Sequence, residues 1–201
     1  MKTKILVACE ESGIVREAFK AKGYDAWSCD LLPSAIPGQH YQGNVLDILK
    51  DWSIIGGKPD IVIAFTPCTY SCNSGVRWLW RQGIPVLDRW HKMKEMVDLF
   101  YAIWNCGVPK ICMENPIPHK YAKLPKYTQI IQPWQFGHGE TKATCLWLKR
   151  LPELIPTNIV HGREARIHKM APSCYRSRER SKTYAGIAEA MATQWGTMID
   201  A

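Results

Sequence analysis

Apolar residues in this chain form short continuous runs, separated by segments in which they recur every three to four positions. Three runs have the length of a buried strand and lie at residues 4–9, 24–29 and 60–65. Between the first two, the apolar spacing predicts a helix over 13–21, with Ser12 as its N-cap and Gly23 after its end. A strand, a helix and a second strand in this order are typical of an open α/β sheet with parallel strands.

The rest of the chain continues this pattern. Residues 33–43, which include proline and glycine, predict a loop, and the run Glu114-Asn115-Pro116 ends a further strand. The other predicted elements are a short helix over 44–52, a helix over 86–106, a strand over 110–113, a strand pair over 128–132 and 143–148, and a helix over 184–196. Together they predict a single domain over 1–201: an α/β protein with an open, mostly parallel twisted sheet and helices on both faces, which is a Rossmann-like arrangement.

Composition favours a soluble globular protein of the cytoplasm. The 201 residues are 46% hydrophobic and 22% charged, which suits one packed domain and excludes a disordered chain. Eight cysteines are scattered without a disulfide framework, and several lie in apolar runs, as Cys9, Cys29 and Cys112 do. The first residues do not resemble a signal peptide, and no apolar run approaches the roughly 18 residues that span a membrane. We therefore expect reduced thiols and no membrane partner.

A net charge of +8 indicates a polyanionic partner such as DNA or a nucleotide, although a solvated basic surface is the alternative. The charge is uneven along the chain. Between Lys149 and Lys182 there are nine Lys or Arg residues against three Glu. This segment is the predicted polyanion surface.

Reactive side chains follow several of the predicted strands. Open α/β sheets bind ligands beyond the carboxyl ends of their strands, so Gly13, Asp30, Cys68 and Glu114 should gather at one edge. A thiolate and a proton-donating carboxyl group suit attack on an electron-poor ring. A buried apolar role for Cys68 is one alternative. A Cys–His hydrolase is another, although no histidine follows a predicted strand.

A zinc site is not favoured. The nearest cysteine pairs, Cys68 with Cys72 and Cys106 with Cys112, lack the paired spacing of zinc ligands. Cys72 is therefore interpreted as a bystander. No metal is expected.

The order of these motifs resembles that of DNA cytosine-5 methyltransferases, especially compact phage and prophage members, over about three quarters of the chain. The matching stretches are Ser12-Gly13, Asp30, Gly43-Asn44-Val45, Pro67-Cys68 and Glu114-Asn115-Pro116. The resemblance implies a methyltransferase fold that uses S-adenosylmethionine. It also implies that Cys68 adds to carbon 6 of cytosine while Glu114 protonates or hydrogen-bonds ring nitrogen 3, so that carbon 5 accepts the methyl group.

The resemblance also implies a cofactor site. Asp30 would bind the ribose hydroxyls, and the amide of Asn44 would replace the family's aspartate at the adenine amino group. The first loop has one glycine where most members have several, and a plain strand-to-helix turn is its alternative interpretation. The implied cofactor-binding residues are Cys9, Glu10, Glu11, Ser12, Gly13, Asp30, Leu31, Asn44, Pro67 and Gly186.

Substrate contacts follow from the same resemblance. Lys142 and Thr144 occupy the place of a family motif whose arginines are absent, and Pro116 replaces a common valine. Residues 71–81 would form a lid over the target base, with basic and aromatic side chains suited to stacking and phosphate contact. The implied substrate-binding residues are Pro67, Ser71, Arg77, Asn115, Pro116, Lys142 and Thr144.

The chain departs from the family in one large feature. Only a short basic segment, 149–183, stands where most members carry a large target recognition domain. Three hypotheses follow: a methyltransferase acting on DNA; another carbon 5 modification of cytosine, or action on a free cytidine nucleotide; and a noncatalytic nucleic-acid-binding protein. The amino-acid sequence does not determine which nucleotides surround the target base, the oligomeric state or any partner protein.

Overall fold

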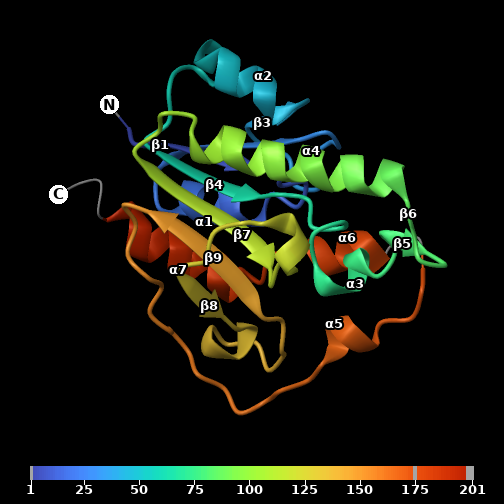
Figure 1. Cartoon of the computed structure of the whole chain (residues 1–201). Coiled ribbons are helices and arrows are strands. Elements are labelled where there is room, and N and C mark those ends of the chain that lie inside the picture. Colours follow the sequence, from blue (N-terminus) through green and yellow to red (C-terminus); the bar gives the residue numbers. More distant parts are fainter. Residues whose placement is uncertain (1, 174–175, 198–201) are drawn as a thin grey trace.

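A single seven-stranded sheet organises the chain in the computed structural model, which describes residues 2–173 and 176–197 (Figure 1). The strand order is β3-β2-β1-β4-β7-β9-β8. The first five strands in that order are parallel, whereas β9 is antiparallel to both neighbours. The strands are β1 (Lys4–Ala8), β2 (Asp25–Asp30), β3 (His40–Gln42), β4 (Ile61–Phe65), β7 (Lys110–Pro116), β8 (Gln129–Ile131) and β9 (Thr144–Lys149). The predicted mostly parallel α/β sheet is confirmed.

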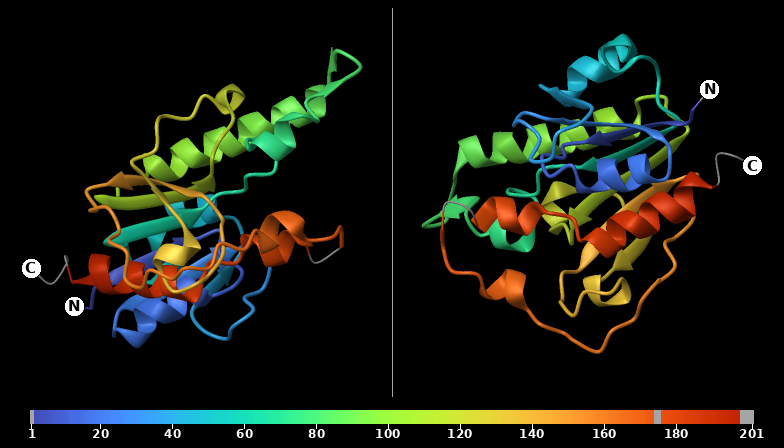
Figure 2. Two further views of the ribbon diagram at one scale, coloured as in Figure 1. Left: turned by 90° about the horizontal axis from the view of Figure 1, so that it is seen from below. Right: turned by 180° about the vertical axis from the view of Figure 1, so that it is seen from behind.

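Helices cover both faces of this sheet (Figures 1 and 2). Alternate strand residues point to opposite faces, so Ile61 and Ile63 pack with α1 (Ile14–Ala21) and α7 (Ala185–Gly196). Val62 and Ala64 pack with α2 (Val45–Lys50) and α4 (Leu87–Trp104) on the other face. Burial on both faces explains why β4 is a continuous apolar run.

Several expected elements are present and others needed correction. The strand pair predicted near residues 130 and 145 is the antiparallel pair β8 and β9. The predicted loop 33–43 contains β3, a three-residue edge strand. The strand expected to end at Met113 continues to Pro116, because Glu114 to Pro116 pair with β9. Glu114 therefore lies within a strand rather than after one.

The predicted N-cap of α1 was also wrong. The N-cap position is Gly13, whose φ of 72° is in the left-handed region. A Cβ atom there would lie 2.9 Å from the guanidinium of Arg16, so both its dihedral angle and its surroundings favour glycine. The hydroxyl of Ser12, one residue earlier, accepts a hydrogen bond of 3.3 Å from the Ile14 amide.

Short elements without a sequence pattern complete the structure. They include a two-stranded hairpin between the third and fourth helices, and short helices in the segments after Cys68 and after β9. These elements are α3 (Asn73–Val76), β5 (Trp80–Arg81), β6 (Ile84–Pro85), α5 (Arg166–Lys169), α6 (Arg176–Ser181) and the 3-10 turns Trp52–Ile55, Lys120–Ala122 and Pro133–Gln135. The predicted basic segment 149–183 includes residues 174 and 175, which lie outside the described residues. Within the described chain, no helix combines the length and apolar character needed to cross a membrane.

Candidate active site

Cys68 and Glu114 come together at the carboxyl edge of the sheet because their strands are neighbours. Phe65, the last residue of β4, pairs in register with Glu114 in β7, and Cys68 follows Phe65 by three residues. The two side chains are close enough for the charge of Glu114 to contribute to raising the pKa of Cys68. A sulfur nucleophile and a carboxyl group therefore share one site.

Glu114 occupies an environment that retains its proton. Burial raises the pKa of the Glu114 carboxyl group, and the positive charge of Lys142 opposes this shift only in part. Among the described residues, its carboxyl oxygens make no hydrogen bond or ion pair. The neutral form consequently persists to higher pH than in a solvated glutamate. This arrangement suits a carboxyl group that donates a hydrogen bond or a proton.

Asn115 supports the loop that carries Cys68. Its amide nitrogen donates to the carbonyl oxygen of Thr66 at 3.0 Å and to the Thr66 hydroxyl at 2.8 Å. The side chain is buried, and its oxygen has no partner among the described residues. The resemblance implies substrate binding for this residue. In the structure, Asn115 joins β7 to the segment just after β4, two residues before Cys68.

Cys72 is part of the site rather than a bystander. Its amide donates to the Cys68 carbonyl at 3.2 Å, which brings the two side chains to one turn. Contact with the Cys68 thiol is the largest cause that lowers the pKa of Cys72 to about 5. The Ser74 hydroxyl and the backbone amides of Ser74 and Gly75, at the start of α3, act in the same direction despite the opposing effect of burial.

The same contact acts on Cys68 with the opposite sign. Contact with Cys72 and burial raise the pKa of the Cys68 thiol above the ordinary value. The two thiols are coupled, so they lose their protons as a pair rather than as independent groups. The four-residue spacing of the cysteines was the sequence signal for this pair, because residues four apart meet in a helical turn.

Glu10, in the first loop, is committed to its own helix. Its carboxylate accepts hydrogen bonds from the amides of Val15 at 2.6 Å and Arg16 at 3.3 Å, and so satisfies two free donors at the start of α1. Burial raises its pKa to about 7 despite these bonds. The structure thus gives Glu10 a capping role and leaves its carboxylate few sites for a ligand.

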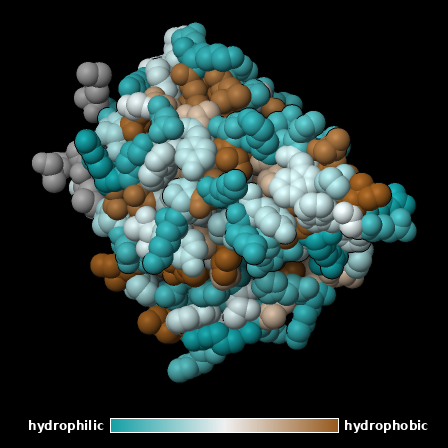
Figure 3. All heavy atoms as spheres, viewed as in Figure 1, coloured by the Kyte–Doolittle hydropathy of each residue, from teal (hydrophilic) through white to brown (hydrophobic). Residues whose placement is uncertain are grey.

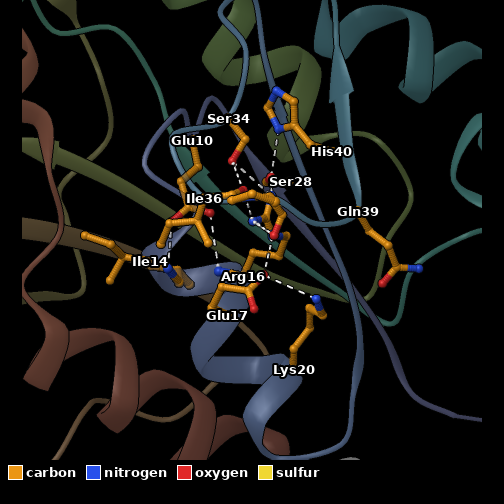
Figure 4. A network of polar contacts seen from close by, with 12 residues as sticks. Glu10, Ile14, Arg16, Glu17, Lys20, Ser28, Ser34, Ile36, Gln39 and His40 are labelled. Carbon is orange, nitrogen blue, oxygen red and sulfur yellow. Dashed lines mark hydrogen bonds and ion pairs between the residues drawn. The ribbon is translucent and has the colours of Figure 1, made fainter.

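Arg16 is a structural residue that the sequence analysis missed. Its fully buried guanidinium donates to the Ser28 hydroxyl at 2.8 Å, the Ser34 hydroxyl at 3.1 Å and the Ile36 carbonyl at 2.6 Å (Figure 4). These bonds join α1 to β2 and to the loop that follows Asp30. No local pattern distinguishes Arg16 from a solvated arginine, because, apart from the adjacent Glu17, its partners are 12 to 21 residues away.

The end of β2 provides a carboxylate suited to a sugar. Asp30 is half-buried, and its Oδ1 accepts a bond from the Leu32 amide at 2.9 Å. Within the described residues, Oδ2 has no hydrogen-bond donor. Beside it, Leu31 is 71% exposed and offers apolar surface. A carboxylate that accepts hydrogen bonds fits the ribose hydroxyls of S-adenosylmethionine, and the apolar surface beside it fits the adenine face.

Other implied cofactor contacts are engaged within the protein. The Asn44 side-chain oxygen accepts from the Leu46 amide at 3.0 Å as the N-cap of α2. Burial raises the pKa of Cys9 to about 12, which keeps this thiol neutral. A Cβ on Gly186 would lie 1.9 Å from the Phe136 carbonyl oxygen, so this glycine permits α7 to pack against the loop after β8.

The basic segment returns to the first loop. Arg178 in α6 forms an ion pair with both carboxylate oxygens of Glu11. This contact places α6 over the loop between β1 and α1, on the same edge as Asp30. Glu11 is mostly buried by it, with 13% of its side chain exposed. Any ligand amino group at Glu11 must share the carboxylate with Arg178.

Lys142 lies close enough to Cys68 and Glu114 to act on both electrostatically. Its ammonium group donates to the Lys182 carbonyl at 3.3 Å and lies 5.9 Å from the centre of the Tyr184 ring. Thr144 is buried and bonds through its hydroxyl to the Lys142 carbonyl at 3.1 Å. Lys142 therefore belongs to the site, and Thr144 shapes the turn that carries it.

The remaining implied substrate contacts differ in exposure. Ser71 is buried, and its carbonyl accepts from the His119 amide at 2.7 Å. Pro67 and Arg77 are exposed, and Pro116 is half-buried opposite Thr144. A cavity of about 540 Å³ lies at the opposite, amino edge of the sheet, and none of the implied site residues lines it.

The chain matches no protein-family model and no curated protein.

The seven described cysteines are free thiols. Among the described residues, no group of three or more His, Cys, Asp or Glu side chains is placed to hold a metal ion.

Proposed function

We propose that this protein transfers a methyl group from S-adenosylmethionine to carbon 5 of cytosine in DNA. The observation that supports this proposal most directly is the pairing of Cys68 with Glu114 across neighbouring strands. A sulfur nucleophile and a neutral carboxyl group at one strand edge are the two groups that activation of a cytosine ring requires. The mostly parallel sheet with helices on both faces is compatible with the methyltransferase fold implied by the sequence resemblance.

The protein's own residues account for the activation of the base. The Cys68 sulfur forms a bond to carbon 6 while its proton passes to the Cys72 sulfur. The electron pair of the bond between carbons 5 and 6 then moves to the bond between carbons 4 and 5, the pair between carbon 4 and ring nitrogen 3 moves onto the nitrogen, and Glu114 donates its proton there. Lys142 stabilises the glutamate that results. After carbon 5 has accepted the methyl group, nitrogen 3 returns its proton to Glu114. Loss of the carbon 5 proton to solvent then breaks the bond to Cys68 and restores the double bond between carbons 5 and 6, and Cys68 recovers its proton from Cys72.

The cofactor contributes the methyl group. Asp30 and Leu31 would hold its ribose and adenine, and the first loop would lie against its methionine part. When bound, S-adenosylmethionine supplies an electrophilic methyl group to carbon 5. The Arg178–Glu11 ion pair lies at the same edge.

One observation favours a second substrate class. The described residues of the segment after β9 form two short helices, α5 and α6, where a large recognition domain would stand in the family. A free cytidine nucleotide, or a different carbon 5 modification, would use the same Cys68 and Glu114 chemistry without duplex recognition. The noncatalytic alternative requires that this pair have no chemical role.

Nucleoside mass spectrometry can distinguish these proposals. DNA and the free nucleotide pool would be analysed from cells that express the wild type, Cys68→Ala, Glu114→Gln or the control Cys106→Ala. We expect 5-methylcytosine in DNA with the wild type and the control, and none with the two site variants. Modified cytosine only in the nucleotide pool would support the second substrate class. If cytosine is unmodified in both pools while folded protein is present, the proposed cytosine-modifying activity is refuted.

Calorimetric titration tests the cofactor separately. We expect S-adenosylmethionine to bind the wild type and to bind Asp30→Ala at least about tenfold more weakly, since a lost hydrogen-bonded carboxylate costs on the order of 1.5–3 kcal/mol. Asp60→Ala, at the amino end of β4, is the matched control. An absence of binding to the wild type at millimolar ligand would exclude this cofactor.

A further inference from the structure

The hairpin β5–β6 exposes large apolar side chains next to the candidate active site. Trp78 and Trp80 are 57% and 43% exposed, and Ile84 and Leu87 are 67% and 65% exposed. The hairpin projects from the body at the start of α4 (Figure 2), and that edge shows apolar and near-neutral residues among hydrophilic ones (Figure 3). Apolar surface clustered in this way is characteristic of interaction sites.

Basic side chains are interleaved with these aromatic rings. The Arg77 guanidinium lies 4.8 Å from the centre of the Trp78 ring, and Arg81 is exposed on β5. The sequence from residue 66 to 87 contains no Asp or Glu. An indole face beside an uncompensated guanidinium is complementary to an unpaired base and its phosphate.

The same surface continues toward the thiol pair. The Trp80 ring contacts Trp90 with 5.8 Å between centroids, and Trp90 contacts Tyr121 at 5.5 Å. The segment that carries Tyr121 is joined to the site by a bridge between Cys72 and Pro118. Lys120 and Lys123, on the same segment, are exposed and form no ion pair with a described residue. Aromatic and basic groups thus extend from the hairpin to the edge of the site.

We propose that this aromatic and basic surface, formed by residues 77–87, which include the hairpin β5–β6, and by residues 117–126, binds single-stranded DNA and guides an unpaired cytosine toward Cys68. The inference rests on the proposed function for its substrate. Stacking on exposed indoles requires bases that are already unpaired, whereas in a duplex each base is covered by its neighbours. The short segment after β9 adds charge but little surface to offset the extrusion of a base from a duplex.

Fluorescence anisotropy without cofactor tests the surface independently of catalysis. The probes are one fluorescein-labelled, cytosine-containing oligonucleotide as a single DNA strand, as a duplex and as the matching RNA. The variants are Trp78→Ala and Arg81→Ala, with Ile155→Ala and Lys50→Ala as exposed apolar and basic controls elsewhere. Circular dichroism and thermal melting would establish that each variant is folded.

We expect the single DNA strand to bind most tightly, and each hairpin variant to bind it on the order of tenfold more weakly than the controls. Arg81→Ala should also reduce the salt dependence of binding, because one phosphate contact is lost. Tighter binding of duplex DNA or of RNA would overturn the inference, as would unchanged binding by both hairpin variants. DNA methylation together with unchanged binding would refute this surface alone. Strand binding that depends on the hairpin, without any cytosine modification, would support the surface and refute the proposed function.

Discussion

The amide of Cys72 donates a hydrogen bond to the carbonyl oxygen of Cys68 at 3.2 Å, which places the two thiols in one turn of the chain. This relationship makes the two thiols one titrating unit. It lowers the pKa of Cys72 to about 5 and raises that of Cys68. The proposed nucleophile therefore has a proton acceptor in contact with it before any substrate binds.

Alkylation of the two cysteines should reveal this coupling. At pH 6, iodoacetamide should modify Cys72 in the wild type, because its pKa of about 5 makes it largely thiolate. Cys68→Ala removes the contact with the thiol, so the pKa of Cys72 should rise and its alkylation rate should fall by about tenfold for each pKa unit. Peptide mass spectrometry measures the rates, with Cys106→Ala as the control. Equal rates at Cys72 in Cys68→Ala and in the control would contradict the coupling.

Replacing Cys72 should have the reverse effect on Cys68. In Cys72→Ala, the thiol of Cys68 loses both the contact and the negative charge that raise its pKa. Its pKa should fall, and its alkylation near pH 8 should become faster than in the wild type. A slower reaction would show that Cys72 does not hold the thiolate.

Lys142 should tune the acidity of Glu114. The positive charge of Lys142 lowers the pKa of Glu114 against the effect of burial. In Lys142→Met, the pKa of Glu114 should therefore rise, and the neutral carboxyl group should persist to higher pH. Carbon-13 NMR of labelled glutamate carboxyl groups measures this shift, and Glu114→Gln assigns the signal. Lys123→Met, at an exposed position, should leave the titration unchanged; the same shift in both lysine variants would refute a specific effect.

Glu10 should make stability depend on pH. Its pKa is about 7 in the fold against an ordinary 4.5, so the folded state binds more protons between these values. The free energy of unfolding should thus fall as the pH rises from about 4.5 to about 7 and then level off. Relative to Glu10→Gln, the wild type should lose up to about 3 kcal/mol across this window. Urea unfolding at several pH values measures this loss, with Glu153→Gln as an exposed control. If the difference in free energy of unfolding between the wild type and Glu10→Gln does not change with pH, the predicted effect of Glu10 is disproved.

Gly186→Ala should destabilise the protein although alanine favours a helix. A Cβ at this position would lie 1.9 Å from the Phe136 carbonyl oxygen, and backbone must move to admit it. We expect a net loss of roughly 1–3 kcal/mol, since overpacking outweighs a helix-propensity gain of about 1 kcal/mol. The neighbouring exposed variant Ala185→Ser should change stability by less than about 0.5 kcal/mol. Urea unfolding compares the two variants, and equal stabilities would show that α7 has room to shift.

Local patterns accounted for the elements that bury whole faces. The core strands β1, β2, β4 and β7 are apolar runs, and α1, α4 and α7 have apolar residues at helical spacing. Each pattern reflects burial of that segment itself, so it can be recognised without its partners. Strand β3 and the hairpin β5–β6 are only two or three residues long, and α5 and α6 bury few side chains. Such short segments form because of their contacts with other parts of the chain, and a local sequence pattern carries no information about those contacts.

The candidate site divides in the same way. The sequence was sufficient to predict that Cys68 and Glu114 would meet, because Cys68 follows one buried parallel strand and Glu114 lies near the end of its neighbour. The contact of Cys72 with Cys68, the capping of α1 by Glu10 and the ion pair of Arg178 with Glu11 across 167 positions emerge only from the tertiary structure. These contacts depend on side-chain geometry and on distant segments. A hydrogen bond needs its partner within about 3 Å, and sequence spacing alone does not fix that distance.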